Sequence, residues 1–178
     1  YDHLLFVLCL ILISKSTRTL LYAVTGFTIA HSITLSLATM NLIKVRTELV
    51  YLLIALSIII LAREILFARK NKSEPPLSIK FPISISAFFG LLHGFGFAVV
   101  LQELGLPFDM KINALLFFNL GVEIGQLIFI GIVLLIAIIL RSNPLFSNHY
   151  LLFLNQLGIY FIGTISTFWF LQRTFALI

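Results

Sequence analysis

The segment from Ile112 to Leu140 contains 29 consecutive residues, of which only one, Glu123, is charged. A helix needs about 20 apolar residues to cross the hydrocarbon core of a bilayer, and this run exceeds that length. In the whole chain 60% of the residues are hydrophobic and 11% are charged, against roughly 25% charged in a soluble domain. These features exclude a water-soluble fold and make the lipid bilayer the expected surroundings of the chain.

Five further apolar stretches are separated by short polar or basic segments, which leaves room for about six crossings. The sequence therefore predicts an all-α fold, a polytopic membrane helix bundle in which residues 1–178 form a single transmembrane domain. The predicted helices span approximately residues 1–14, 19–41, 48–68, 81–102, 112–140 and 150–172. The first helix rises only about 18 Å, against about 30 Å of hydrocarbon, so we expect it to be truncated at its N-terminus.

The basic residues predict the orientation, because Lys and Arg accumulate on the cytoplasmic side of a membrane protein. The loops after the first, third and fifth helices hold eight of the 12 basic residues, and the opposite side holds four. We expect an integral protein of the bacterial inner membrane, with both termini of this chain outside the cytoplasm. The net charge of +5 comes from helix ends, so nucleic acid is not an expected partner. An extracytoplasmic N-terminal segment or a partner subunit is left open.

Ionisable groups inside membrane helices are costly, and each one is a functional candidate. Five such residues lie in the middle or outer half of the predicted helices: Asp2, His3, His31, His93 and Glu123. At 1.5 Å per residue they lie between about 17 and 26 Å from the cytoplasmic ends of their helices. Imidazole together with carboxylate suits divalent ions such as Ni²⁺, Co²⁺ or Zn²⁺. We therefore predict an intramembrane metal site whose ligands are these five residues.

Polar residues accompany the predicted ligands at helical spacing. Asn119, Glu123 and Gln126 fall at i, i+4 and i+7, which places them on one stripe of a helix. Ser32 follows His31 directly and adds a hydroxyl beside it. We expect Ser32, Asn119 and Gln126 to orient the ligands from a second shell rather than to bind the ion.

Glycines with the G-x-x-x-G spacing occur in two of the predicted helices, and this spacing lets a second helix approach closely. Gly90 and Gly94 lie on either side of His93, and Gly121 and Gly125 lie in the predicted fifth helix. We expect a close helix contact at both places. The glycines around His93 also predict a local unwinding that presents backbone carbonyls.

Four segments in series resemble the HupE/UreJ family, membrane proteins associated with nickel supply to hydrogenase and urease. These segments are Tyr1–Phe6, Phe27–Leu35, Phe89–Ala98 and Phe118–Gln126. The resemblance covers residues 1 to about 130, and it is to the branch in which the membrane domain follows an extracytoplasmic N-terminal region. It implies a divalent-metal permease, for nickel or cobalt.

Two other functions remain open at this point. In a metal-dependent membrane enzyme, three protein ligands would leave an open position at which Zn²⁺ activates a water molecule. In an accessory subunit of a larger membrane complex, the polar cluster would serve helix packing. The sequence contains no Ser-His-Asp arrangement, phosphate-binding loop or dinucleotide fingerprint, and the transporter is the interpretation we favour over an enzyme.

Overall fold

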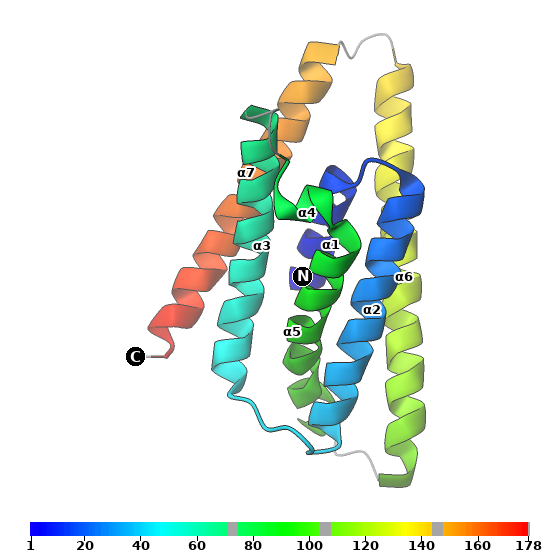
Figure 1. The fold of residues 1–178 in the computed structure, drawn as a ribbon, viewed down its shortest axis with the longest axis vertical. Helices are drawn as coiled ribbons and strands as arrows, with labels where there is room; N and C mark the ends of the chain where they lie inside the picture. The colour runs from blue at the N-terminus through cyan, green and yellow to red at the C-terminus, as the bar shows by residue number, and fades with distance from the viewer. Residues whose placement is uncertain (71–74, 104–107, 144–147, 178) are drawn as a thin grey trace.

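The computed structural model describes residues 1–70, 75–103, 108–143 and 148–177 of the chain. These residues form seven helices and no strand, and the helices run as a bundle (Figure 1). The helices are α1 (Asp2–Ile13), α2 (Thr17–Thr39), α3 (Thr47–Lys70), α4 (Leu77–Lys80), α5 (Pro82–Glu103), α6 (Phe108–Ser142) and α7 (Asn148–Phe175). The predicted helical membrane bundle is thus confirmed, and the six helices other than α4 fall on the six apolar stretches. The four-residue α4 was not predicted.

Helices of membrane-spanning length account for most of the bundle. Within the described residues, four helices are long and apolar enough to cross a bilayer: α2, α3, and the greater part of α6 and of α7. The 12-residue α1 and the segment Pro82–Ala98 of α5 are shorter apolar helices. Figure 1 shows that α1 begins about halfway along the bundle, so Asp2 and His3 lie inside it rather than at one end.

The short helix α1 lies at the centre of the bundle, and its side chains form much of the core. Phe6, Val7, Cys9 and Leu10 are each at most 1% exposed, and Cys9 is a free cysteine. The ring of Phe6 stacks on that of Phe27 in α2, with 4.8 Å between the centroids. Because lipid tails are as apolar as these side chains, close van der Waals packing stabilises the core more than the hydrophobic effect does.

Local signals in the sequence set both ends of α2. Ser16 precedes the helix, and its hydroxyl accepts a hydrogen bond from the backbone N–H of Thr19 at 3.2 Å, as an N-cap does. At the other end, Asn41 adopts a φ of 58°, and the N–H of Leu42 bonds to the carbonyl of Leu37 at 2.9 Å. Asparagine tolerates this left-handed conformation, which ends the helix and satisfies its last carbonyls.

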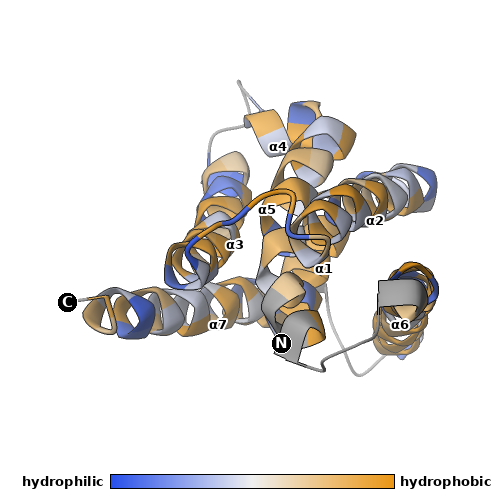
Figure 2. Ribbon diagram, turned by 90° about the horizontal axis from the view of Figure 1, so that it is seen from below, coloured by the Kyte–Doolittle hydropathy of each residue, from blue (hydrophilic) through white to orange (hydrophobic). Residues whose placement is uncertain are grey.

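Helix α6 lies at the edge of the bundle and exposes most of its apolar surface. Figure 2 shows it on the opposite side of the bundle from α3, and side chains such as Phe117 and Ile138 are 69% and 63% exposed. Apart from the neighbouring residues and backbone of α6 itself, no described atom lies within 4 Å of a Cβ built on Gly121 or Gly125. The predicted helix contact at these two glycines is therefore wrong for the described part of the chain, because α6 turns its polar stripe toward α2 instead.

Candidate metal centre

Three of the predicted ligands meet inside the bundle, each carried by a different helix. The ring of His3 from α1 lies 5.2 Å from that of His31 in α2 and 4.8 Å from that of His93 in α5, between centroids. Both His31 and His93 are fully buried. Phe27 and Phe97 complete the cluster, with their ring centroids 5.4 and 4.7 Å from His3. We call His3, His31 and His93 the histidine cluster.

Two glycines of α5 allow this cluster to form, because they bring α5 against the backbone of α2. A Cβ on Gly90 would lie 2.5 Å from the carbonyl oxygen of Phe27. A Cβ on Gly94 would overlap the carbonyl oxygen of His31 and the hydroxyl of Thr34. The close contact predicted at these glycines is present. The predicted unwinding is not found, since α5 is continuous through this segment.

Hydrogen bonding fixes the tautomer of His93. The hydroxyl of Ser57 donates its one proton to the carbonyl of Ile54 at 2.6 Å, and Nε2 of His93 lies 3.1 Å from the same hydroxyl oxygen. Ser57 must therefore accept this second bond, so Nε2 carries the ring proton and Nδ1 carries a lone pair. Nδ1 of His93 is buried and has no hydrogen-bond partner among the described residues. It is free to bind an ion.

The same reasoning applies to His31. The side-chain amide of Asn119 donates through Nδ2 to the carbonyl of Leu115 at 2.8 Å, which turns its Oδ1 toward His31 Nδ1 at 3.2 Å. An amide oxygen only accepts, so Nδ1 of His31 carries the proton and Nε2 carries the lone pair. Nε2 of His31 and Nε2 of His3 are both buried without a partner in the part of the chain that the structure describes. The bond to Asn119 thus holds the ring of His31 in one orientation.

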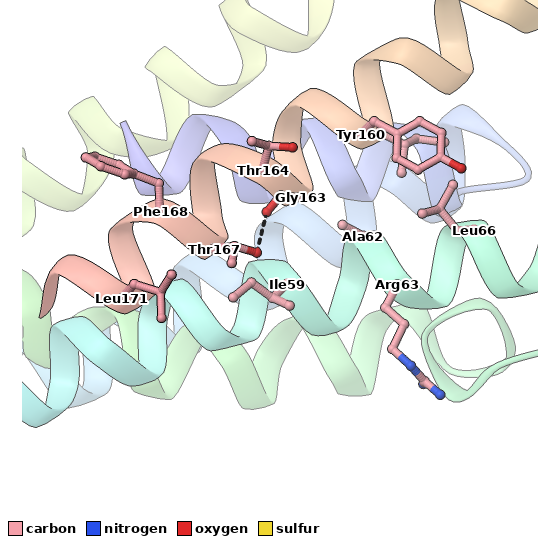
Figure 3. Close-up of a pocket in the computed structure, with 11 residues that line it drawn as sticks. Ile59, Ala62, Arg63, Leu66, Tyr160, Gly163, Thr164, Thr167, Phe168 and Leu171 are labelled. Carbon is pink, nitrogen blue, oxygen red and sulfur yellow. Dashed lines mark hydrogen bonds between the residues drawn. The ribbon is translucent and has the colours of Figure 1, made fainter. Parts of the chain in front are cut away.

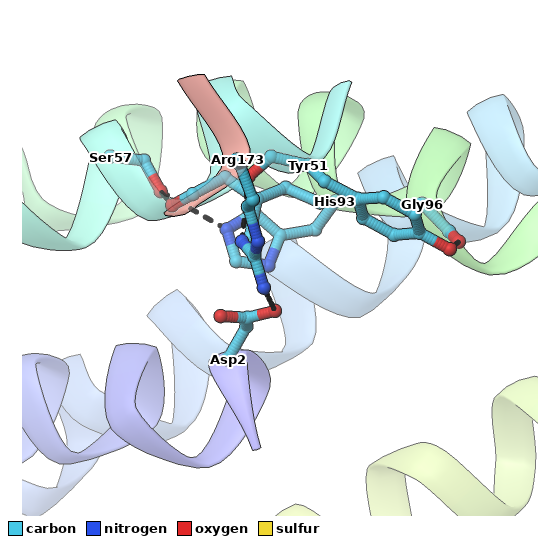
Figure 4. A network of polar contacts seen from close by, with 7 residues as sticks. Asp2, Tyr51, Ser57, His93, Gly96 and Arg173 are labelled. Carbon is cyan, nitrogen blue, oxygen red and sulfur yellow. Dashed lines mark hydrogen bonds and ion pairs between the residues drawn. The ribbon is translucent and has the colours of Figure 1, made fainter. Parts of the chain in front are cut away.

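Asp2 does not bond to the histidines, because Arg173 at the end of α7 holds it. Nη2 of Arg173 lies 2.8 Å from Oδ2 of Asp2, and its Nη1 donates to the carbonyl of Tyr51 at 2.7 Å (Figure 4). The other carboxylate oxygen, Oδ1, is buried and has no partner within the described ranges. The Tyr51 hydroxyl in turn donates to the carbonyl of Gly96 in α5 at 3.2 Å, which links α3 to the helix of His93.

Glu123 and Gln126 of α6 bind α2 rather than the histidine cluster. The hydroxyl of Thr25 donates to Oε1 of Glu123 at 3.3 Å, and the hydroxyl of Thr28 donates to Oε1 of Gln126 at 3.2 Å. With the Asn119–His31 pair these contacts form what we call the α2–α6 polar seam. Glu123 thus lies on the face of α2 that carries Thr25, six residues before His31.

Ser32 is the remaining predicted residue, and it bonds within its own helix. The predicted residues together do not form a closed coordination shell. The Ser32 hydroxyl donates to the carbonyl of Thr28 at 2.7 Å, within its own helix, rather than to His31. Within the described residues, no three His, Cys, Asp or Glu side chains are arranged to hold one metal ion as they stand. The structure therefore brings three ligand candidates into contact and keeps the two carboxylates in other pairings.

A surface groove lies away from this centre, between α3 and α7. Its volume is about 520 Å³, and Figure 3 shows Ile59 and Ala62 on one wall and Gly163 and Thr167 on the other. The hydroxyl of Thr167 donates to the carbonyl of Gly163 within its own helix at 2.7 Å. The groove is mostly apolar and contains none of the predicted ligands.

Sequence reasoning missed the residues that hold the ligands from other helices. Arg173 counted only as one of the basic residues at helix ends, although a cation in the last turn of an apolar helix could have been paired with a carboxylate. Ser57 gave no signal, because one hydroxyl in an apolar helix most often bonds to its own backbone. Tyr51 resembles any interfacial tyrosine until its contacts are known.

The fold and the site together define a class: a polytopic integral membrane protein with a buried histidine cluster between its helices. The chain belongs to the HupE / UreJ protein family, because the sequence model of that family matches residues 1–173. Among the curated proteins none matches the chain, and among the solved structures none matches it either.

Proposed function

We propose that this protein is a permease for a divalent transition-metal ion of the nickel or cobalt type, and that the histidine cluster binds the ion in transit. The family to which the chain belongs supports this proposal, because its membrane proteins are linked to nickel supply. Imidazole nitrogens suit Ni²⁺, Co²⁺ and Zn²⁺, and the described contacts of the cluster include no thiolate or thioether that would favour Cu⁺.

The observation that carries the proposal is the state of the ring nitrogens. His31 and His93 each use one nitrogen as a donor, to Asn119 and Ser57, and each keeps the other buried and unpartnered among the described residues. Buried polar atoms are nearly always hydrogen-bonded, so bare lone pairs at this density need an explanation. Metal-binding histidines have this arrangement, in which the second nitrogen donates to a neighbour and the first faces the metal.

Binding requires the ligands to move from the arrangement described above. The rings of the histidine cluster meet edge to face, at interplanar angles of 89° for His3 with His31 and 80° for His3 with His93. Rotation of these rings would let their lone pairs converge on one ion. We propose that Asp2 then adds a carboxylate oxygen, and that Glu123 receives the ion or its charge at a later point along α2. Protonation of the ligands would release the ion.

The protein's setting follows from the charge distribution. We propose that residues 1–178 form one transmembrane domain in the bacterial inner membrane, with both termini of the chain outside the cytoplasm. The end of the bundle that carries Lys15, Arg69 and Arg141 would then face the cytoplasm. An extracytoplasmic N-terminal segment or a partner subunit would contact the opposite end.

Metal uptake into proteoliposomes tests the proposal. The purified full-length protein should take up one or two ions from a panel of Ni²⁺, Co²⁺, Zn²⁺ and Mg²⁺, and His93→Ala should abolish that uptake. His149→Ala is the matched control, because His149 is exposed at the start of α7 and far along the chain from the cluster. It should transport as the wild type does.

Other outcomes would assign the cluster differently. No uptake together with one tightly bound metal per chain would favour a metal-dependent enzyme of the zinc type, and no uptake with no bound metal would favour an accessory subunit whose histidines serve packing. Equal uptake by the wild type and His93→Ala would remove the histidine cluster from the transport path.

A further inference from the structure

A charged pair, formed by Asp2 and Arg173, adjoins the histidine cluster. The two side chains lie 2.8 Å apart and are only 20% and 23% exposed. Asp2 lies in the first helix and Arg173 in the last, so the pair links the two ends of the chain within the bundle. In a membrane such a pair is costly unless both charges are matched, which marks it as a functional candidate.

The pair lies at the boundary of the cluster. Asp2 immediately precedes His3, whose ring contacts both other histidines. Arg173 also bonds to Tyr51, whose hydroxyl reaches Gly96, one turn after His93. Figure 4 shows the carboxylate, the guanidinium and the imidazole of His93 in one network of contacts. An ion bound by the cluster would therefore lie near the charge of Arg173.

Arg173 has partners that do not depend on Asp2. Its guanidinium lies over the ring of Tyr51 at 5.6 Å and over that of Trp169 at 5.7 Å, and it donates to the Tyr51 carbonyl. Cation–π contacts of this kind stabilise a guanidinium that is out of water. Asp2, in contrast, has its Oδ1 buried without a partner in the described part of the chain. The arginine can release the carboxylate and remain held, while the carboxylate lacks a second donor.

We propose that Arg173 is a positioning residue that acts through Asp2: it holds the carboxylate while the histidine cluster is empty and yields it to the incoming divalent ion. This inference rests on the proposed function. The empty site is then neutral, because the guanidinium balances the carboxylate. When the ion arrives, Arg173 stays on Tyr51 and Trp169 and competes with the ion for the carboxylate of Asp2. Arg173 therefore lowers the affinity for metal and speeds its release.

Removal of the charge of Arg173 tests this role. In Arg173→Gln the Kd for Ni²⁺ should fall about tenfold, which is typical of coupled sites, while the maximal rate of uptake falls because release is slower. Arg173→Lys keeps the charge and should restore a Kd near that of the wild type. Arg141→Gln is the matched control, because Arg141 is exposed at the end of α6, and its Kd and rate should not change. If Arg173→Gln cannot be isolated folded, Arg173→Met removes the charge without leaving a polar group in the membrane.

Asp2→Asn tests whether Arg173 acts through the carboxylate. This variant alone should weaken Ni²⁺ binding, and the addition of Arg173→Gln to it should then change the Kd by less than about twofold, because the two residues act as one unit. If Arg173 only supports the fold, Arg173→Gln should bind Ni²⁺ more weakly. It would not combine a lower Kd with a lower maximal rate of uptake.

The failure of this inference can be told from the failure of the proposed function. If the wild type binds and transports Ni²⁺ but Arg173→Gln has an unchanged or higher Kd, the role of Arg173 is overturned and the permease stands. If the wild type binds none of the tested metals, both proposals are overturned. If Arg173→Gln gains affinity also in the Asp2→Asn background, Arg173 does not act through Asp2.

Discussion

Helix α2 contacts α5 on one side and α6 on the other, and the two interfaces are built in different ways. Toward α5 the backbones nearly touch, because Gly90 and Gly94 leave no room for a Cβ. Toward α6, the side chains of Thr25, Thr28 and His31 form three hydrogen-bonded polar pairs. Both α5 and α6 carry a G-x-x-x-G spacing, yet only that of α5 faces a described helix.

The difference shows what the G-x-x-x-G spacing can and cannot specify. Small residues permit close approach, but they do not by themselves attract a second helix from lipid. On α6 the polar stripe of Asn119, Glu123 and Gln126 has more to gain from a partner than a glycine has, because polar groups in lipid are costly. The stripe therefore faces α2, and Gly121 and Gly125 face away from it. Helix α5, which carries His93, contacts α2 through close backbone packing, and α6 contacts α2 through hydrogen bonds.

The largest expected effect comes from Gly94→Ala. Its new methyl would overlap the backbone carbonyl oxygen of His31, which cannot move without a shift of α2. We expect a loss of about 3 kcal/mol or more in the free energy of unfolding, at the upper end of overpacking effects. Unfolding in mixed micelles by denaturing detergent measures it.

Gly125→Ala is the control for that prediction. Its Cβ would meet no described atom of another helix within 4 Å, and alanine is favoured over glycine in a helix by about 0.5–1 kcal/mol. The stability of Gly125→Ala should therefore equal or slightly exceed that of the wild type. Equal losses in Gly94→Ala and Gly125→Ala would contradict the difference between the two interfaces.

A smaller effect is expected at the His31 end of the α2–α6 polar seam. Asn119→Leu removes the acceptor of His31 Nδ1–H and leaves that proton buried and unpaired, which should cost about 2 kcal/mol of unfolding free energy. It also frees the ring to take the other tautomer, so Ni²⁺ binding should weaken about tenfold, as loss of a second-shell partner does. Asn119→Gln keeps an amide oxygen that can accept this bond. If Asn119→Gln is as defective as Asn119→Leu, the acceptor role of Asn119 is contradicted.

The helices could be predicted from the sequence because their signal is a long apolar run between charged ends. The meeting of His3, His31 and His93 could also be anticipated, since counting residues from the basic helix ends fixes depth, and depth is one of the two coordinates of a helical residue. The other coordinate is the direction in which a side chain points around its helix. The glycines beside His93 supplied that direction for α5.

The partners of the two carboxylates could not be predicted, for the same reason. The stripe of α6 was visible in the spacing of Asn119 and Glu123, but nothing in the sequence says which neighbour it meets or how far that helix is shifted along its axis. The pairing of Asp2 with Arg173 could not be predicted, because the two residues are 171 positions apart in the sequence. A pairing between the first and last helices depends on where α7 lies against α1 and α3, and hydropathy does not encode that position.

The smallest expected effect, and the sharpest test of the polar seam, is Gln126→Leu. Thr28 loses one acceptor but keeps the carbonyl of Val24 at 3.1 Å, and the substitution also removes the Gln126 Nε2 that has no partner among the described residues. Hydrogen bonds between membrane helices contribute about 0.6 kcal/mol on average, so the unfolding free energy should fall by no more than that. The same unfolding titration, run beside Asn119→Leu, measures the difference. A loss as large as that of Asn119→Leu would mean that the three pairs of the seam stabilise the α2–α6 contact cooperatively. Only then would removing the Thr28–Gln126 pair cost as much as removing the His31–Asn119 pair, which orients a buried histidine.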